Sequence, residues 1–197
     1  MFGTGSSLSR NIIDDVTGST PQVPCTATLA DGAVVALRRM LPADRAEIRA
    51  LADALTPRER YLRFFTAQPG YLDEWTESLV DPSPDRFTLG AYDHNGLIGV
   101  ANYIEVNDPG CAEVAIVVAH GHHHRGVGTA LLSTLGLIAR GNGESHLVAD
   151  ILAENHDMQK VMADAGWQCS RHLDGTVITV EVDLNPTSFR PEASHER

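Results

Sequence analysis

The sequence is poor in aromatic residues, cysteine and basic side chains. Aromatic residues make up 6% of its 197 positions, and 15 Lys and Arg stand against 26 Asp and Glu, for a formal net charge of −11. Because nucleic acids and anionic membranes attract basic surfaces, this charge argues against either as a partner. An acidic surface also serves solubility, and we give that ordinary explanation the greater weight.

Long apolar runs are absent as well. No apolar segment approaches the roughly 20 residues that a membrane-spanning helix needs, and the first residues lack the basic and apolar regions of a signal peptide. We therefore expect a cytoplasmic protein. The apolar content of 43% is typical of a globular chain, and the length falls in the range of a single domain. The three cysteines, Cys25, Cys111 and Cys169, are odd in number and far apart, so neither a disulfide framework nor a C-x-x-C metal site is expected.

Two ends without regular patterns flank a region of strands and helices. Residues 1–30 are rich in Gly, Ser, Thr and Pro and predict a flexible N-terminal arm, and residues 185–197 predict a similar tail. Strands are expected at 34–39, 87–93, 97–106, 112–118, 146–152, 167–172 and 176–184, and helices near 44–55, from Thr56-Pro57, at 127–141 and at 157–165. Residues 112–152 form a β-α-β unit, which predicts a parallel strand pair.

The most informative stretch runs from Val118 to Leu132, where an apolar strand enters a glycine-bearing turn that becomes an amphipathic helix. The first N–H groups of a helix have no intrahelical partner and the helix dipole is positive there, so this turn is suited to binding phosphate oxygens. Gly126 and Gly128 are expected to let the ligand approach, because a Cβ there would obstruct it.

Spacing excludes two families of phosphate-binding turn. A nucleoside triphosphatase loop needs a lysine after its last glycine, and Val127 follows Gly126. A dinucleotide fingerprint needs a third glycine where Leu131 stands. Residues 123–128 instead resemble the coenzyme A pyrophosphate loop of GCN5-related N-acetyltransferases (GNAT), whose pattern is Q/R-x-x-G-x-G/A, with His123 replacing the usual Gln or Arg.

A second block supports the resemblance. Residues 151–158, followed by Gly166-Trp167, resemble the next element of the family, in which an asparagine after the fifth strand contacts the coenzyme. The resemblance spans about residues 34–184 and implies an α/β (α+β) fold at 31–184, with a mixed, splayed sheet of about seven strands and about four flanking helices. Residues 55–65 resemble the corresponding segment of bacterial protein lysine acetyltransferases.

Acetyl-CoA is the cosubstrate that the resemblance implies, and its binding residues follow by position. The backbone of the strand end would pair with pantetheine, the loop would wrap the pyrophosphate, and an asparagine would bond the pantetheine region. These residues are Ile116, Val117, Val118, His123, His124, Arg125, Gly126, Val127, Gly128, Thr129 and Asn155. A helix cap is a second possible role for Asn155, and the two roles can coexist.

Glu113 is the expected catalytic base. An alkyl amine is protonated at neutral pH and cannot attack a thioester, so a base is required. Glu113 lies in an apolar strand on the face of Ala115 and Val117, where burial would suit it to general base catalysis, and it matches a base of the lysine acetyltransferases. The alternatives are a glutamate that points to water and one that pairs with an arginine.

The remaining parts of the reaction are also assigned by resemblance. A main-chain N–H near Val117 or Val118 would hold the oxyanion. Many relatives place a tyrosine at the position of Met162 to protonate the departing thiolate, and methionine cannot donate a proton. An acyl-cysteine route through Cys111 is disfavoured because the sequence places no histidine to activate its thiol.

The loop histidines, His120, His122, His123 and His124, suggest a metal site. Contiguous loop histidines rarely converge on one ion without a distant partner, so no metal is expected. His123 and His124 are instead expected to flank the pyrophosphate, whose charge favours their protonated form, while Arg125 adds a permanent charge or faces solvent.

The expected function is transfer of an acetyl group from acetyl-CoA to a primary amine. A protein lysine is the preferred acceptor, and a small-molecule amine is the alternative. A non-catalytic acyl-CoA-binding regulatory module stays open because of Met162 and the histidines of the loop. No nucleic-acid or membrane partner is expected, and the sequence leaves the oligomeric state open.

Overall fold

The structure is a computed structural model, and it describes residues 23–185. One eight-stranded sheet runs through it in the order β1-β2-β3-β4-β5-β6-β8-β7. Neighbouring strands are antiparallel except β5 and β6, which are parallel as expected. The strands are β1 (Cys25–Thr28), β2 (Val34–Arg39), β3 (Arg86–Asp93), β4 (Gly96–Glu105), β5 (Cys111–Val118), β6 (His146–Leu152), β7 (Gln168–Asp174) and β8 (Val177–Asp183).

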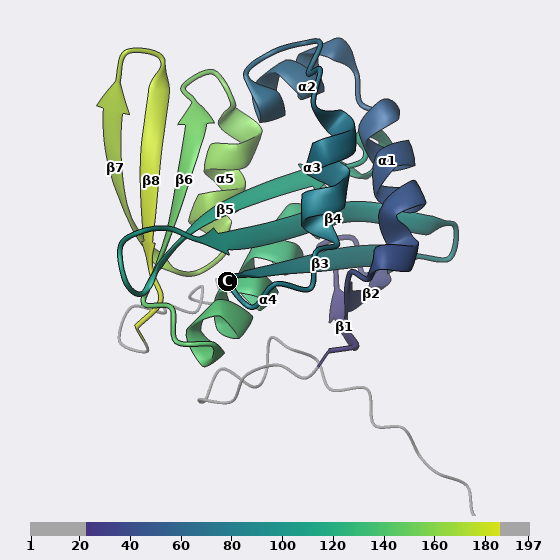
Figure 1. Ribbon diagram of the computed structural model, residues 1–197, viewed down its shortest axis with the longest axis horizontal. Coiled ribbons are helices and arrows are strands. Elements are labelled where there is room, and N and C mark those ends of the chain that lie inside the picture. The colour runs from purple at the N-terminus through teal and green to yellow at the C-terminus, as the bar shows by residue number, and fades with distance from the viewer. Residues whose placement is uncertain (1–22, 186–197) are drawn as a thin grey trace, which may run out of the picture.

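Helices cover both faces of the sheet (Figure 1). They are α1 (Arg45–Asp53), α2 (Pro57–Phe64), α3 (Leu72–Leu79), α4 (Val127–Gly141) and α5 (His156–Asp164). The buried residues of α4 and α5 share one apolar cluster with Val114 of β5. Those of α1, α2 and α3 share a second cluster with Val117 of the same strand. Because alternate residues of a strand face opposite ways, β5 contributes to both layers.

The mixed α/β fold expected from the sequence is confirmed, with two additions. Strand β1 pairs with β2 from Cys25 to Thr28, so this part of the predicted N-terminal arm belongs to the sheet. Helix α3 at Leu72–Leu79 was not expected from the sequence. Residues 1–22 of the arm and 186–197 of the tail lie outside the described residues. Within 23–185, no helix is long and apolar enough to cross a membrane.

Candidate active site

The ladder between β5 and β6 is short, and the two strands diverge beyond it (Figure 1). They pair only at Cys111↔His146, Ala112↔Leu147 and Glu113↔Val148. From Val114 to Val118, the edge of β5 that faces β6 has no strand partner in the described part of the chain. The splay that the resemblance implied is therefore present, and Glu113 stands where it begins.

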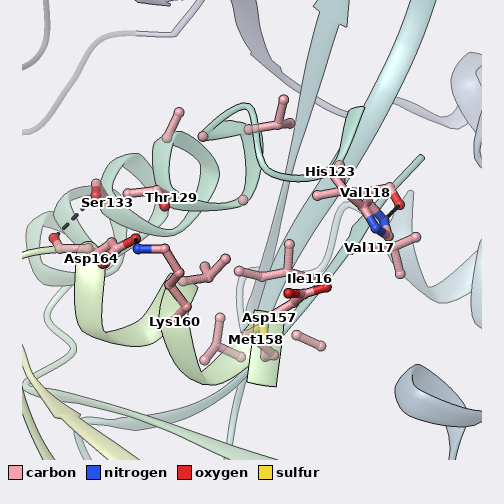
Figure 2. Close-up of a pocket in the computed structure, with 18 of the residues that line it drawn as sticks. Ile116, Val117, Val118, His123, Thr129, Ser133, Asp157, Met158, Lys160 and Asp164 are labelled. Atoms are coloured by element: carbon pink, nitrogen blue, oxygen red, sulfur yellow. Dashed lines mark hydrogen bonds and ion pairs between the residues drawn. The ribbon is translucent and has the colours of Figure 1, made fainter. Parts of the chain in front are cut away.

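A cavity of about 1100 Å³ lies at this splay, with β5 and the helices α2, α4 and α5 contributing to its walls. Figure 2 shows Ile116, Val117 and Val118 along the strand and Thr129 and Lys160 on the helices beyond it. Of the residues expected to bind the coenzyme, all but Arg125 line this cavity, namely Ile116, Val117, Val118, His123, His124, Gly126, Val127, Gly128, Thr129 and Asn155. Glu113 lines it as well.

The start of α4 is built to receive an anion. Gly126 is its N-cap residue, with a φ of 91°, and it has no side chain to accept hydrogen bonds from the first turn. No capping side chain accepts from the first backbone N–H groups of the helix, so these groups can donate to a ligand. They lie at the positive end of the helix dipole. Val127, Gly128 and Thr129 line the cavity, which places this donor set against the space for a ligand.

The two glycines of the turn are required by conformation and packing. Gly126 has a left-handed backbone, and a Cβ there would lie 3.3 Å from the backbone nitrogen of Ala30. A Cβ on Gly128 would lie 3.0 Å from Cγ2 of Val161 on α5. A Cβ at either position would therefore crowd atoms of the protein itself, and its obstruction of the ligand stays a prediction.

His123 faces the end of β5 (Figure 2). Its Nε2 atom lies 3.0 Å from the carbonyl oxygen of Val118, so the neutral ring can donate a hydrogen bond that ties the turn to the strand. The same nitrogen lies 3.4 Å from Oε1 of Glu59 on α2. His123 therefore has a structural role inside the protein, and its expected contact with the pyrophosphate stays a prediction.

Glu59 connects α2 to the histidine loop. Its Oε2 atom accepts a hydrogen bond from the Thr56 amide at 2.7 Å, which completes a capping box, and its Oε1 atom lies 2.8 Å from Nδ1 of His120. Partial burial raises the pKa of Glu59, but the hydrogen bonds from Thr56 and His120 outweigh it, and the pKa lies below its ordinary value. The possible ligand atoms of Glu59, His120 and His123 lie within 4.8 Å of one another. The fold thus brings an acidic residue from a distant part of the chain, Glu59, next to two of the loop histidines.

Arg125 does not line the cavity. Its Nε atom donates a hydrogen bond to Oδ2 of Asp31 at 2.6 Å, and its Nη1 atom lies 2.8 Å from Nδ1 of His122. The ion pair holds the pKa of Asp31 below its ordinary value. His124 has a left-handed φ of 58°. Its Nδ1 atom lies 3.8 Å from Oδ1 of Asp157 on α5. Arg125 therefore fastens the loop to the turn between β1 and β2.

Asn155 caps helix α5. Its Oδ1 atom accepts a hydrogen bond from the amide of Met158 at 3.1 Å, so the capping role considered from the sequence is confirmed. The side chain also lines the cavity, and its Nδ2 atom has no hydrogen-bond partner among residues 23–185. A contact between this amide group and the coenzyme stays a prediction.

Glu113 is exposed, which corrects the expectation that it is buried. Ala112 and Val114, which flank it in the strand, are buried. The pairing of β5 with β6 ends at Glu113, and the cavity opens there. The side chain of Glu113 makes no hydrogen bond or ion pair with any other described residue, so the alternative of a structural arginine partner is not realised.

Two other expectations concern the departing thiolate and the cysteines. Met162 is fully buried in the apolar cluster under α5, and no tyrosine lines the cavity within the described residues.

Burial raises the pKa of the Cys111 thiol, and Cys111 is absent from the cavity lining. A covalent route through this cysteine is therefore unsupported by its position and by its protonation.

None of the side chains with which α2 and its ends wall the cavity was singled out from the sequence. Leu55, Leu62, Arg63 and Phe65 line the cavity from this side, together with Glu59. These residues lie within the segment 55–65 that carried the resemblance to lysine acetyltransferases. That segment was therefore the available signal, but nothing in its local pattern says which side chains face the cavity.

Comparisons with known proteins agree with this geometry. Residues 46–167 match the acetyltransferase (GNAT) family. An acetyltransferase of Pseudomonas aeruginosa is 26% identical over 153 residues, which cover 75% of this chain and 82% of that protein. The GNAT domain of S. lividans PAT is similar with a TM-score of 0.72 and 25% identity, over 81% of this chain and 96% of that one.

A spermidine N-acetyltransferase from Vibrio cholerae, solved with CoA and spermine, has a TM-score of 0.61 and covers 78% of this chain and 98% of its own. At 17% identity this likeness shows a common fold. The family match is the stronger finding, because it spans more than half of the chain and includes both the cavity strand and the α4 turn. The chain belongs to the acetyltransferase (GNAT) family, whose members use acetyl-CoA.

Proposed function

We propose that this protein transfers an acetyl group from acetyl-CoA to a primary amine, with Glu113 as the general base. The observation that carries the proposal is the place of Glu113, at the start of the splay and open to the cavity. The other carboxyl groups of the cavity are engaged by side chains. Glu59, Asp150, Asp157 and Asp164 each have a hydrogen-bond or ion-pair partner.

The unpaired edge of β5 supports the donor side of the proposal. Between Val114 and Val118 its main-chain groups face a cavity instead of a strand, so they can pair with the amides of pantetheine. The start of α4 would then receive the pyrophosphate. A main-chain N–H near Val117 or Val118 would donate to the oxyanion that forms when the amine attacks.

In the proposed reaction Glu113 accepts a proton from the ammonium group of the acceptor. The freed amine attacks the thioester carbonyl, the new C–N bond forms, and the C–S bond breaks as the thiolate departs. Because Met162 cannot donate a proton, the thiolate takes its proton from water or from the attacking amine. The carboxyl of Glu113 releases its proton to solvent before the next turnover.

We favour a protein lysine as the acceptor. The segment 55–65 resembles that of protein lysine acetyltransferases, and S. lividans PAT is a protein acetyltransferase. Two aromatic side chains on this segment are exposed, Tyr61 at 36% and Phe65 at 43%, and Phe65 also lines the cavity. Exposed aromatic residues beside a binding site are typical of protein interfaces. A small-molecule amine is the alternative.

Replacing Glu113 by glutamine tests the base. We measure thiol release from acetyl-CoA with a panel of lysine peptides and small amines, and acetyl-CoA binding by calorimetry. Glu113→Gln should lower kcat by about 10²- to 10⁴-fold, the usual contribution of a general base, with coenzyme affinity unchanged. Glu74→Gln is the control, because Glu74 is exposed on α3 and does not line this cavity. Wild-type turnover with an unchanged Glu113→Gln rate would reject the assignment.

A further inference from the structure

Arg63 presents a cation to the cavity, and no described residue supplies an anion that pairs with it. Among residues 23–185 its guanidinium makes no ion pair or hydrogen bond, and its Nε atom is buried without a partner. The group lies against two aromatic rings, with Cζ 5.1 Å from the centre of the Phe64 ring and 5.7 Å from that of Trp75. Such contacts use the face of the guanidinium and leave its N–H edge free.

Its neighbours on α2 differ from Arg63 in this respect. Arg58 forms an ion pair with Glu154 at 2.9 Å. Arg60 donates to the backbone oxygen of Asp53 at 2.6 Å, although its Nε atom also lacks a partner. A partly buried guanidinium with no acceptor is costly to a folded protein, so its retention points to a ligand that supplies the acceptor.

The charge of Arg63 is maintained at neutral pH. Burial lowers its pKa to about 10, although the nearby Glu113 opposes the effect. Arg63 and Glu113 therefore influence each other across the same cavity without pairing. Both line it, Arg63 from α2 and Glu113 from β5. The acceptor side of the cavity thus carries one positive and one negative side chain, each without a hydrogen-bonded partner among the described residues.

This pair of charges selects a particular kind of acceptor. An ammonium group is attracted by Glu113 and repelled by Arg63, so an acceptor with only positive charge would leave Arg63 unsatisfied. An acceptor with a carboxylate near its amine satisfies both. The planar fork of a guanidinium matches the two oxygens of a carboxylate, and apolar residues Leu55, Leu62 and Phe65 beside it would exclude water from the contact.

We propose that Arg63 forms an acceptor subsite that binds a carboxylate held close to the amine to be acetylated. The proposal rests on the amine acetylation proposed above and adds the substrate class. The carboxylate could belong to a free amino acid or to an acidic residue beside a target lysine. The recognition chemistry is the same, and the two arms of the experiment separate the sources.

The first arm compares initial rates on L-lysine and L-methionine with rates on their carboxamides. The second compares a peptide in which glutamate flanks the lysine with the same peptide carrying glutamine. In at least one arm the wild type should prefer the carboxylate by about tenfold or more in kcat/KM, as a charge-assisted hydrogen bond implies. Arg63→Gln should bring that ratio close to one, and Arg63→Lys should keep part of it.

Two controls separate recognition from folding. Arg58→Gln, on the same helix and outside the cavity lining, should keep the full preference. Arg63→Gln should unfold close to the temperature of the wild type, since the loss of the contacts with the Phe64 and Trp75 rings is offset by the removal of a partly buried charge with no anionic partner among the described residues. Acetyl-CoA affinity should be unchanged in each variant. A wild type that prefers neither carboxylate, or an Arg63→Gln variant that keeps the preference, overturns the proposal.

A binding measurement keeps this test distinct from that of the proposed function. The N-acetylated forms of the same amino acids and peptides, and their amides, are titrated into the protein with CoA. Tighter binding of the carboxylate forms that is lost in Arg63→Gln supports the subsite even when no amine is acetylated. Equal binding of carboxylate and amide forms overturns the subsite, whether or not acetylation occurs.

Discussion

Glu113 faces Val148 at the last register position that β5 and β6 share. One residue later the strands have no further pairing, and the cavity opens between them. The position that closes the ladder is therefore also the one that holds the proposed base. A strand residue in a fully paired sheet would not have room beside it for an acceptor and a thioester, so the short ladder and the proposed chemistry are connected.

Asn155 allows capping and coenzyme binding to be separated by two substitutions. Asn155→Ala removes the acceptor for the Met158 amide and should lower the free energy of unfolding by about 1 kcal/mol. Asn155→Asp keeps a capping oxygen and should unfold like the wild type. Because it lacks the amide donor, it should bind acetyl-CoA about tenfold more weakly in calorimetry. Unchanged affinity of Asn155→Asp would remove Asn155 from the coenzyme site.

The contact between Gly128 and Val161 predicts a compensating pair of substitutions. Gly128→Ala places a Cβ 3.0 Å from Val161 Cγ2 and should cost about 1–3 kcal/mol in denaturant unfolding. Val161→Ala opens the space, so adding Gly128→Ala to that background should cost less. If the double variant regains stability but still fails to bind acetyl-CoA, then ligand approach, and not helix packing, explains the glycine.

The bond from His123 to Val118 predicts which replacements the loop accepts. Glutamine retains a nitrogen that can donate to the Val118 carbonyl, so His123→Gln should keep the acetyl-CoA affinity of the wild type. His123→Leu leaves this turn without the bond and should weaken acetyl-CoA binding about tenfold. His172→Gln, on exposed β7, serves as the control. Equal affinities of the leucine and glutamine variants would show that the bond is unimportant.

Asp44 at the start of α1 predicts a pH-dependent contribution to stability. Arg38 donates to its two carboxyl oxygens at 2.7 and 2.9 Å, and the Leu41 amide donates to Oδ2 at 2.8 Å. The Arg38 guanidinium is the main reason that the pKa of Asp44 lies below its ordinary value. The carboxylate therefore stabilises the fold fully above its unfolded pKa, near 3.9, and this contribution is lost as the pH falls through the lower folded pKa.

Asp44→Asn should accordingly lower the free energy of unfolding by about 1–3 kcal/mol at pH 7. The difference from the wild type should shrink as the pH falls below about 4, because the wild-type carboxyl then becomes protonated. Asp53→Asn is the matched control, since Asp53 is 53% exposed and pairs with Arg49 at the surface. A pH-independent difference would contradict the role of the ion pair.

The local patterns of the sequence predicted most of the backbone. The strand at Val34–Arg39, the parallel β5-α4-β6 unit and the helix ending at Gly141 are all present. These elements have strong periodicity or turn residues at their ends, so their structure depends on near neighbours in the chain. Strand β1 has the short sequence Cys-Thr-Ala-Thr, which carries little pattern, and it forms because β2 offers an edge to pair with.

The sequence by itself determined the strand, the glycine turn and the helix start from which the acetyl-CoA site is predicted, because these features are local and the free N–H groups belong to the start of the helix itself. Only the tertiary structure decided the proposed acceptor side. It brought Arg63 of α2 into the cavity of Glu113, and it placed Glu59 against His120 and His123. These contacts join residues far apart in the chain. Their formation depends on how helices pack on a sheet, which no local spacing reports.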